Sequence, residues 1–197
     1  MLLYDAAISG NCYKVRLLFA KLGIAYERRE LSVFDRSDRP QVLGKLNPGL
    51  RVPTLVLDDG RALAESGAIL FHFAEGTEYL PADAFARAQA LQWMFFEQYS
   101  HEPNIAVLRF WAEAGTTHPE AEIEAKRRGG EAALQAMEAH LTDREFFVGD
   151  AYSIADIALY AYTHMAPEGG FTLQPYPAIG SWLARVAGHP GHVAIGD

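Results

Sequence analysis

The stretch that decides the fold is VPTLVLDDGRALAESGAILFHFAEG, residues 52–76. Residues 54–57 form a run of β-branched and apolar side chains that is typical of a strand. The Asp-Gly pair at 59–60 is a strong two-residue hairpin signal, so residues 61–64 are predicted to return antiparallel. Ser66 is predicted to cap a helix whose apolar side chains recur at helical spacing. The stretch therefore predicts a hairpin that leads directly into a helix.

The residues before this hairpin alternate strand and helix signals. Leu2 to Tyr4 suggest a short strand, and SGNCYKVRLLFAKLG, residues 9–23, predicts a helix with apolar positions at i, i+3, i+4 and i+7 from Val15. A second strand is expected over 26–31, a helix or loop over 35–45, and a turn at 47–49. The resulting order, strand, helix, strand, helix, strand, strand, helix (βαβαββα), predicts a mixed four-stranded sheet flanked by helices.

The composition changes after residue 75. Residues 76–82 are predicted to be a linker, and residues 83–197 contain helical patterns without strand-like alternation. We therefore expect an α/β domain over 1–75 and an all-helical domain over 83–197. Within the helical part, SIAD at 153–156 fits a capping box. The run SHEPN at 100–104 places a proline where a long helix would continue, which predicts a kink.

Charge and apolar content exclude several classes of function. The net charge is −8 and no long basic run is present, which argues against binding to a nucleic-acid backbone. From residues 1–10 we expect no secretory signal, and the most apolar later stretch, 154–166, is shorter than the ~20 residues that cross a bilayer. One cysteine allows neither an internal disulfide nor a CxxC pair. The seven histidines show no metal-ligand pattern. We expect a cytoplasmic protein that binds no metal, nucleic acid or membrane.

The polar run at the start of the first predicted helix has two possible explanations. Ser9, Asn11 and Cys12 stand where this helix begins, after the first predicted strand. A polar side chain there can cap the helix, or it can meet a ligand. The residues of this run alone do not choose between them.

Four motifs together resemble the cytosolic glutathione S-transferase family, in particular its bacterial, serine-type, theta- or zeta-like members. These motifs are SGNCYKVR at 9–16, NPGLRVPTL at 47–55, LAESGAIL at 63–70 and FVGDAYSIADI at 147–157. They occur in the order and spacing of the family across nearly the whole chain. The resemblance implies a thioredoxin-like N-terminal domain, an all-helical C-terminal domain, a homodimer, and glutathione as co-substrate.

The resemblance also implies how glutathione is bound. Ser66 would bind the γ-glutamyl carboxylate at a helix N-terminus, and Glu65 would face the ligand's ammonium group. The bond between Val52 and Pro53 would be cis, and the backbone of Val52 would pair with the cysteinyl part as an added strand would. Lys45 and Arg51 are candidates for the glycyl carboxylate, with solvated surface charges as the alternative for both.

The implied sulfur ligand is Ser9, whose hydroxyl would donate a hydrogen bond to the glutathione thiolate. Asn11 and Cys12 are rivals, since an amide can also donate and a thiol could form a mixed disulfide. The alternative role for Cys12 is a small buried residue that fills space in the core. Tyr4 is a further candidate for the sulfur ligand, with a place in the core as its alternative. The electrophile pocket would lie against the helical domain near four residues, which could equally belong to the core: Phe96, Tyr99, Arg109 and Phe110.

The function that this resemblance implies is conjugation of glutathione to small apolar electrophiles, as in detoxification. Three alternatives stay open. The start of the chain also resembles the maleylacetoacetate isomerase branch, although Gly10 and Asn11 stand where that branch has serine and cysteine. A thiol-disulfide reductase would follow if Cys12 reached the sulfur. The third alternative is a non-catalytic interaction module of the same fold.

Overall fold

The computed structural model describes residues 1–197, which divide into two compact units. The first unit consists of residues 1–75 together with 190–197, and the second of residues 76–189. The sequence-based division kept 190–197 with the helical part, whereas in the structure these residues lie with the sheet. No helix is both long enough and apolar enough to cross a membrane.

A four-stranded mixed sheet forms the centre of the first unit. Its strands are β1 (Leu2–Asp5), β2 (Glu27–Glu30), β3 (Thr54–Val56) and β4 (Ala62–Ala64), in the order β2-β1-β3-β4. β1 pairs parallel with β2 and antiparallel with β3, and β3 pairs antiparallel with β4. The predicted hairpin and mixed sheet are confirmed.

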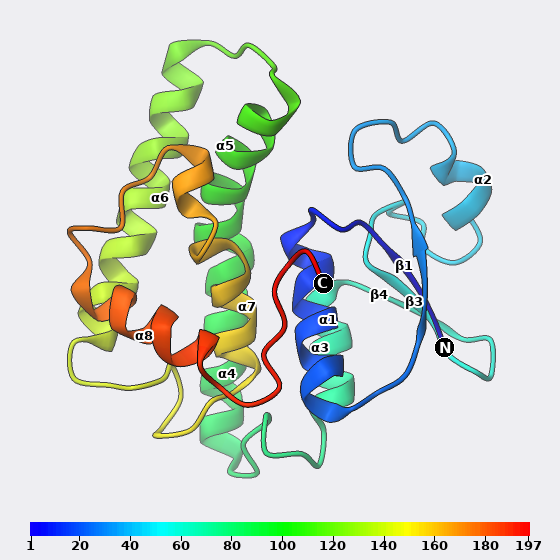
Figure 1. The fold of residues 1–197 in the computed structure, drawn as a ribbon, viewed down its shortest axis with the longest axis horizontal. Coiled ribbons are helices and arrows are strands. Elements are labelled where there is room, and N and C mark those ends of the chain that lie inside the picture. The colour runs from blue at the N-terminus through cyan, green and yellow to red at the C-terminus, as the bar shows by residue number, and fades with distance from the viewer. The chain divides into compact units, whose positions relative to one another are not determined.

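Helices cover both faces of this sheet. α1 (Gly10–Leu22) and α3 (Ser66–Ala74) lie side by side on one face, and the short α2 (Arg39–Leu43) lies on the other (Figure 1). Successive side chains of a strand point to opposite faces. Accordingly, Leu3 packs with α1 and α3, whereas Tyr4 packs with α2.

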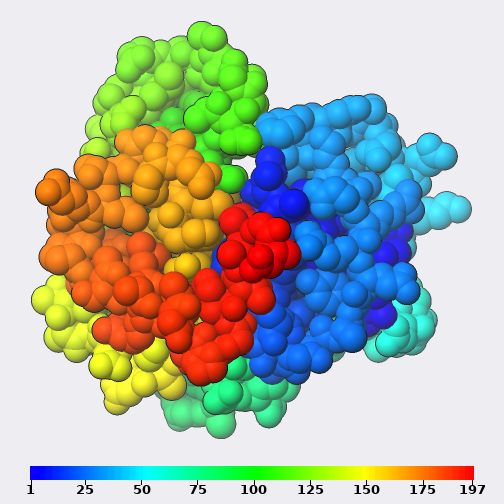
Figure 2. Space-filling model, in the orientation of Figure 1, coloured from blue at the N-terminus to red at the C-terminus, as the bar shows by residue number.

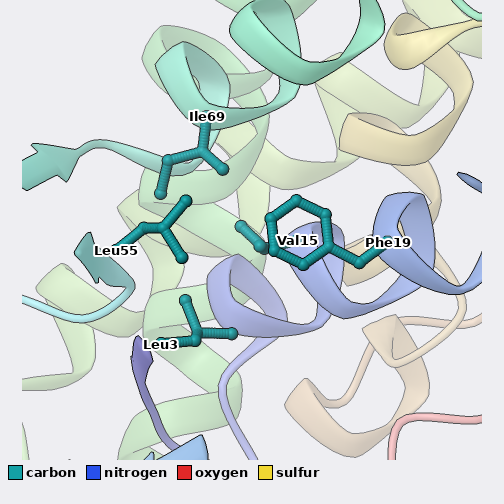
Figure 3. Packing of buried hydrophobic residues seen from close by; sticks show 5 residues of the cluster. All are labelled: Leu3, Val15, Phe19, Leu55 and Ile69. Atoms are coloured by element: carbon teal, nitrogen blue, oxygen red, sulfur yellow. The ribbon is translucent and has the colours of Figure 1, made fainter. Parts of the chain in front are cut away.

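The larger of two core clusters in the sheet unit fixes α1 against the sheet. Leu3 and Leu55 from the strands meet Val15 and Phe19 from α1 and Ile69 from α3, and all five are fully buried (Figure 3). Burying side chains of this size contributes roughly 1.5–3 kcal/mol each. A well-packed core therefore holds α1 against the sheet.

The second unit contains only helices. They are α4 (Ala84–Phe96), a π-helical turn (Glu97–His101), α5 (Glu102–Ala114), α6 (Glu120–Leu141), α7 (Ile154–Thr163), a 3-10 turn (Ala166–Gly169) and α8 (Pro177–Ala187). The prediction of an α/β part followed by an all-helical part is thus confirmed as a fold class.

The proline at 103 does not break its helix. Pro103 lies in the first turn of α5, where a missing N–H costs little, and the chain reaches it through the π-helical turn. Asn104 Nδ2 donates to the carbonyl oxygen of Ser100 at 2.7 Å. The predicted irregularity is therefore a π-helical turn between two helices.

The predicted capping box is present at the start of α7. Ser153 N donates to Asp156 Oδ2 at 2.9 Å, and the Ser153 hydroxyl caps the first turn. Asp156 is fully buried and also accepts hydrogen bonds from Trp182 Nε1 and from Phe147 N. The motif thus stabilises a helix start and joins α7 to α8.

Candidate glutathione site

Ser9 ends a tight turn and begins α1. Its N–H donates to the Ala6 carbonyl oxygen at 2.9 Å, and its Oγ accepts from Cys12 N at 3.3 Å. Ser9 is therefore the N-cap of α1. The cap uses a lone pair of the hydroxyl oxygen and leaves the O–H, on a half-buried side chain, able to donate. Capping and ligand binding are compatible at this residue.

Asn11 joins the starts of α1 and α3. Its Oδ1 accepts from Ser66 Oγ at 3.3 Å and from Lys14 Nζ at 2.7 Å. Both neighbours are donors, so the oxygen of the amide faces them. The structure thereby brings two predicted site residues together, although they lie 55 positions apart in the chain.

The N-terminus of α3 lacks protein partners for its first N–H groups. No side chain caps this helix, and the N–H groups of Ser66 and Gly67 find no acceptor within the chain. Ser66 is only 5% exposed, so its N–H is shielded from bulk water. Donors at such a helix end, together with the helix dipole, suit a carboxylate.

Glu65 precedes this helix in a backbone conformation that L residues rarely adopt. Its φ is 68° and its ψ is 116°, and its side chain is exposed. A non-glycine residue held there costs on the order of 1–3 kcal/mol, and such residues cluster at binding sites. The structure assigns Glu65, not Ser66, as the N-cap residue; Ser66 is the first residue of α3.

The bond between Val52 and Pro53 is cis. Neither the N–H nor the carbonyl of Val52 makes a hydrogen bond within the chain. Asn47 supports the loop before it, because its Nδ2 donates to the Arg51 carbonyl oxygen at 3.0 Å and to Thr54 Oγ1 at 3.0 Å. An extended peptide could therefore pair with Val52 without displacing an existing bond.

Three arginines line a pocket of about 190 Å³ beside this loop: Arg36, Arg39 and Arg51. Arg39 is buried and donates to the carbonyl oxygens of Leu50 at 3.0 Å and Ser32 at 2.7 Å, but it pairs with no carboxylate. Burial, and next the charge of Arg36, lower the pKa of the Arg39 guanidinium. The sequence analysis names Arg51 as a candidate, and the pocket adds Arg36 and Arg39, to which no sequence motif points. Lys45 is exposed and does not line the pocket.

Cys12 occupies the core under the first turn of α1. The side chain is fully buried. Burial, and next the negative charge of Asp5, raise the pKa of the Cys12 thiol far above its ordinary value. A thiol that stays protonated is a poor nucleophile. The environment of Cys12 therefore fits a small buried residue that fills the core better than a reactive thiol that forms a mixed disulfide.

The residues predicted for an electrophile pocket separate into two groups. Phe96 and Tyr99 line a pocket of about 360 Å³ in the helical unit, closed on one side by Gly129 and alanines of α6. Arg109 forms an ion pair with Glu168 instead, and Phe110 does not line this pocket either.

Family comparisons agree with this geometry. Residues 3–78 match the family described as glutathione S-transferase, N-terminal domain, and residues 87–190 match the glutathione S-transferase C-terminal domain. The chain belongs to the glutathione S-transferase family. The predicted family, fold class and enzyme assignment are confirmed.

Relatives within the family include transferases and an oxidoreductase. Glutathione S-transferase 2 of Anopheles gambiae is 30% identical over 189 residues, which cover 93% of this chain and 88% of that protein. A disulfide-bond oxidoreductase of Escherichia coli strain K12, YfcG, is 28% identical, covering 91% and 87%. A crystal structure of a glutathione S-transferase from Pseudomonas fluorescens Pf-5 is 45% identical, with a TM-score of 0.95 and coverage of 100% and 98%.

Proposed function

We propose that this family member conjugates glutathione to small hydrophobic electrophiles and that Ser9 stabilises the glutathione thiolate. The observation that carries the proposal is the start of α3, where the buried Ser66 has an N–H without an acceptor in the chain and donates its O–H to Asn11 Oδ1 at 3.3 Å. This places anion donors beside the residues that begin α1. Other parts of the first unit supply the remaining contacts that a tripeptide needs.

Each part of glutathione finds a matching group in the sheet unit. The γ-glutamyl carboxylate meets the N-terminus of α3, and Glu65 faces the ammonium group. The unpaired backbone of Val52 hydrogen-bonds the cysteinyl residue. The glycyl carboxylate fits the pocket that Arg36, Arg39 and Arg51 line with three positive charges.

Ser9 acts on the sulfur without losing its own proton. A free cysteine thiol has a pKa of about 8.5, and each unit of lowering favours the thiolate by about 1.4 kcal/mol. The Ser9 O–H donates to the sulfur, and the N-terminus of α1 adds its positive dipole potential. The thiolate then forms a carbon–sulfur bond with the electrophile, while a leaving group such as halide departs with its electron pair, or an epoxide or an activated double bond opens and is then protonated. Bringing both substrates together lowers the barrier further.

Retention on immobilised glutathione tests the carboxylate site. Ser66→Ala removes the hydroxyl at the α3 N-terminus, so we expect the variant to flow through a column that retains the native protein. Ser181→Ala is the matched control, because this exposed hydroxyl bonds only the Pro177 carbonyl in the helical unit. Equal retention of the Ser66→Ala variant and the native protein would contradict the site. A non-catalytic module without the site would not be retained in any form.

Reduction of disulfides by glutathione is a second candidate, favoured by the similarity to the Escherichia coli oxidoreductase. The buried Cys12 supplies no reactive thiol. Two glutathione molecules would therefore provide both electrons and both protons, and would leave as glutathione disulfide while the substrate disulfide becomes two thiols. An assay that follows glutathione disulfide with a small disulfide substrate tests this activity, which we expect Cys12→Ala to retain.

We further propose that the protein forms a homodimer. Phe85, Phe95 and Tyr99 lie on one exposed side of α4 and the π-helical turn, with exposures of 72%, 68% and 87%. Exposed aromatic residues on one face of a helix are typical of protein interfaces. Two copies related by a two-fold axis would cover this face.

A further inference from the structure

The C-terminal segment, residues 190–197, lies along α1 in the sheet unit (Figures 1 and 2). Its backbone carbonyls accept hydrogen bonds from side chains of α1 and β2. The donors are Tyr13 Oη to Val193 O (2.7 Å), Arg16 Nη2 to Ile195 O (2.8 Å), Lys21 Nζ to Pro190 O (3.1 Å) and Arg28 Nη1 to Asp197 O (3.1 Å). The segment is therefore held through its backbone along the length of α1.

Arg16 differs from the other three donors because it also contacts the turn before α1. Its Nη2 donates to the Ala7 carbonyl oxygen at 2.8 Å as well as to Ile195, and its Nη1 pairs with Asp5 Oδ1 at 2.7 Å. Arg16 is 3% exposed and Asp5 is fully buried. A buried guanidinium needs acceptors for its N–H groups, so each of these bonds constrains its position.

The turn that Arg16 contacts is the turn that ends at Ser9. Nη1 of Arg16 also donates to the Ala6 carbonyl oxygen at 3.4 Å, and the same oxygen accepts the Ser9 N–H at 2.9 Å. The hydroxyl of Ser9 is thus placed by a turn whose carbonyls are held by Arg16. Arg16 is in turn held by the C-terminal segment.

We propose that Arg16 is a positioning residue for Ser9 and that residues 194–197 help to hold the Arg16 guanidinium in place. This inference rests on the proposed role of Ser9. Without the Ile195 carbonyl, the guanidinium lacks one of its buried acceptors, and the Ala6–Ser9 turn gains freedom. The Ser9 hydroxyl then donates less effectively to the sulfur. The thiol pKa of bound glutathione rises, while the groups that bind the carboxylates stay in place.

Two shortened chains test the proposal as a matched pair. A chain ending at Val193 loses the acceptors of Arg16 and Arg28. A chain ending at Gly196 keeps the Ile195 carbonyl that Arg16 uses, and loses the Arg28 acceptor together with the two hydrogen bonds between Asp197 and Ala194. The ultraviolet absorbance of the bound thiolate, followed against pH, gives the pKa. We expect a rise of about one unit for the Val193 chain, hence roughly tenfold less thiolate below the pKa. We expect no shift for the Gly196 chain and retention of both on immobilised glutathione. A Val193 chain that titrates like the full chain overturns the proposal.

Arg16→Lys provides an independent variant. Lysine keeps a positive charge beside Asp5 but lacks the planar fork that reaches two carbonyls and a carboxylate at once. We expect the same upward pKa shift with kcat reduced more than KM is raised. A purely structural role for Arg16 would lower the melting temperature and leave the pKa unchanged, which would overturn the proposal. If this variant does not fold, the shortened chains, which keep Arg16 and Asp5, decide alone.

Ser9→Ala separates a failure of this inference from a failure of the proposed function. If Ser9→Ala raises the thiol pKa and the Val193 chain does not, only the positioning role is wrong. If Ser9→Ala leaves the pKa unchanged, the sulfur role of Ser9 is wrong. Hydrogen exchange of the ligand-free protein then tests whether the C-terminal segment restrains the Ala6–Ser9 turn. If it does, the Ser9 N–H should exchange faster in the Val193 chain than in the Gly196 chain. Equal exchange rates in the two chains would show that the segment does not restrain this turn.

Discussion

At the scale of single residues, Ser9 and Cys12 show how neighbouring groups on one turn acquire different chemistry. Ser9 is half-buried at the end of the helix, where its O–H can reach a ligand. Cys12 is one turn further into α1 and fully buried, so its thiol stays protonated. Exposure and solvation, rather than intrinsic reactivity, therefore make the two groups chemically different.

The first residue-scale prediction compares Ser9→Ala with Cys12→Ala in conjugation of a chromogenic electrophile. A hydrogen bond to a charged group contributes about 1.5–3 kcal/mol, so Ser9→Ala should lower kcat/KM by roughly 10- to 100-fold. Cys12→Ala should retain most of the activity and lose some stability through the cavity it leaves. Loss of activity in Cys12→Ala alone, with Ser9→Ala active, would show that the thiol carries the chemistry.

Sequence patterns indicate candidate site residues more readily than the residues that support them. Ser9 and Ser66 each stand at a predicted helix start, so the chemistry of helix ends points to them. Asn47 and Arg39 act on backbone carbonyls exposed by loops, and no spacing in the sequence reports such contacts. Lys45 and Arg51 looked alike as cations near the same turn, yet only Arg51 lines the pocket.

At the scale of elements, the capping box of α7 carries a pH-dependent contribution to stability. Burial raises the pKa of Asp156 to about 6 in the folded protein, against four hydrogen bonds that favour the charged form. The unfolded carboxyl titrates near its ordinary value of 3.8. The folded state therefore binds the proton more tightly, and this group's contribution falls as pH rises from about 4 through 6.

The direction of this pH dependence can be measured with Asp156→Asn, which removes the titrating carboxyl group. The free energy of unfolding of the native protein, minus that of the variant, should fall by up to about 3 kcal/mol between pH 4 and pH 7. Urea unfolding at several pH values gives both quantities. A difference that instead grows with pH would show that the hydrogen bonds outweigh burial and hold the pKa of Asp156 below its ordinary value.

Elements with a clear apolar period were predictable, and short irregular ones were not. The hairpin of β3 and β4 and the helix α1 follow from turn chemistry and from side chains buried on one face. α2 spans only Arg39–Leu43, too short for a periodic pattern, and it was predicted only as helix or loop. The π-helical turn before Pro103 depends on how the helix rearranges its hydrogen bonds, which the proline alone does not determine.

At the scale of the whole molecule, sequence reasoning placed the sheet and the helical part but not the return of residues 190–197 to the sheet unit. Apolar periodicity reports local burial, whereas this segment is held by side chains that donate to its backbone. Because these contacts use only the backbone of residues 190–197, the amino-acid sequence of the segment does not indicate them. The consequence for the site is that residues at the two ends of the sequence contribute to the same unit.

The last prediction concerns assembly. If two copies cover the aromatic face of α4, Phe95→Lys places like charges close together across the two-fold axis and removes apolar contact from both sides. Light scattering should give the native protein twice the chain mass of 21.7 kDa, and the variant should approach the single mass on dilution. Ala184→Lys, on the exposed side of α8, is the control and should remain a dimer. A native protein with the single mass at all concentrations would contradict the dimer. A Phe95→Lys variant that stays dimeric would move the interface away from this face.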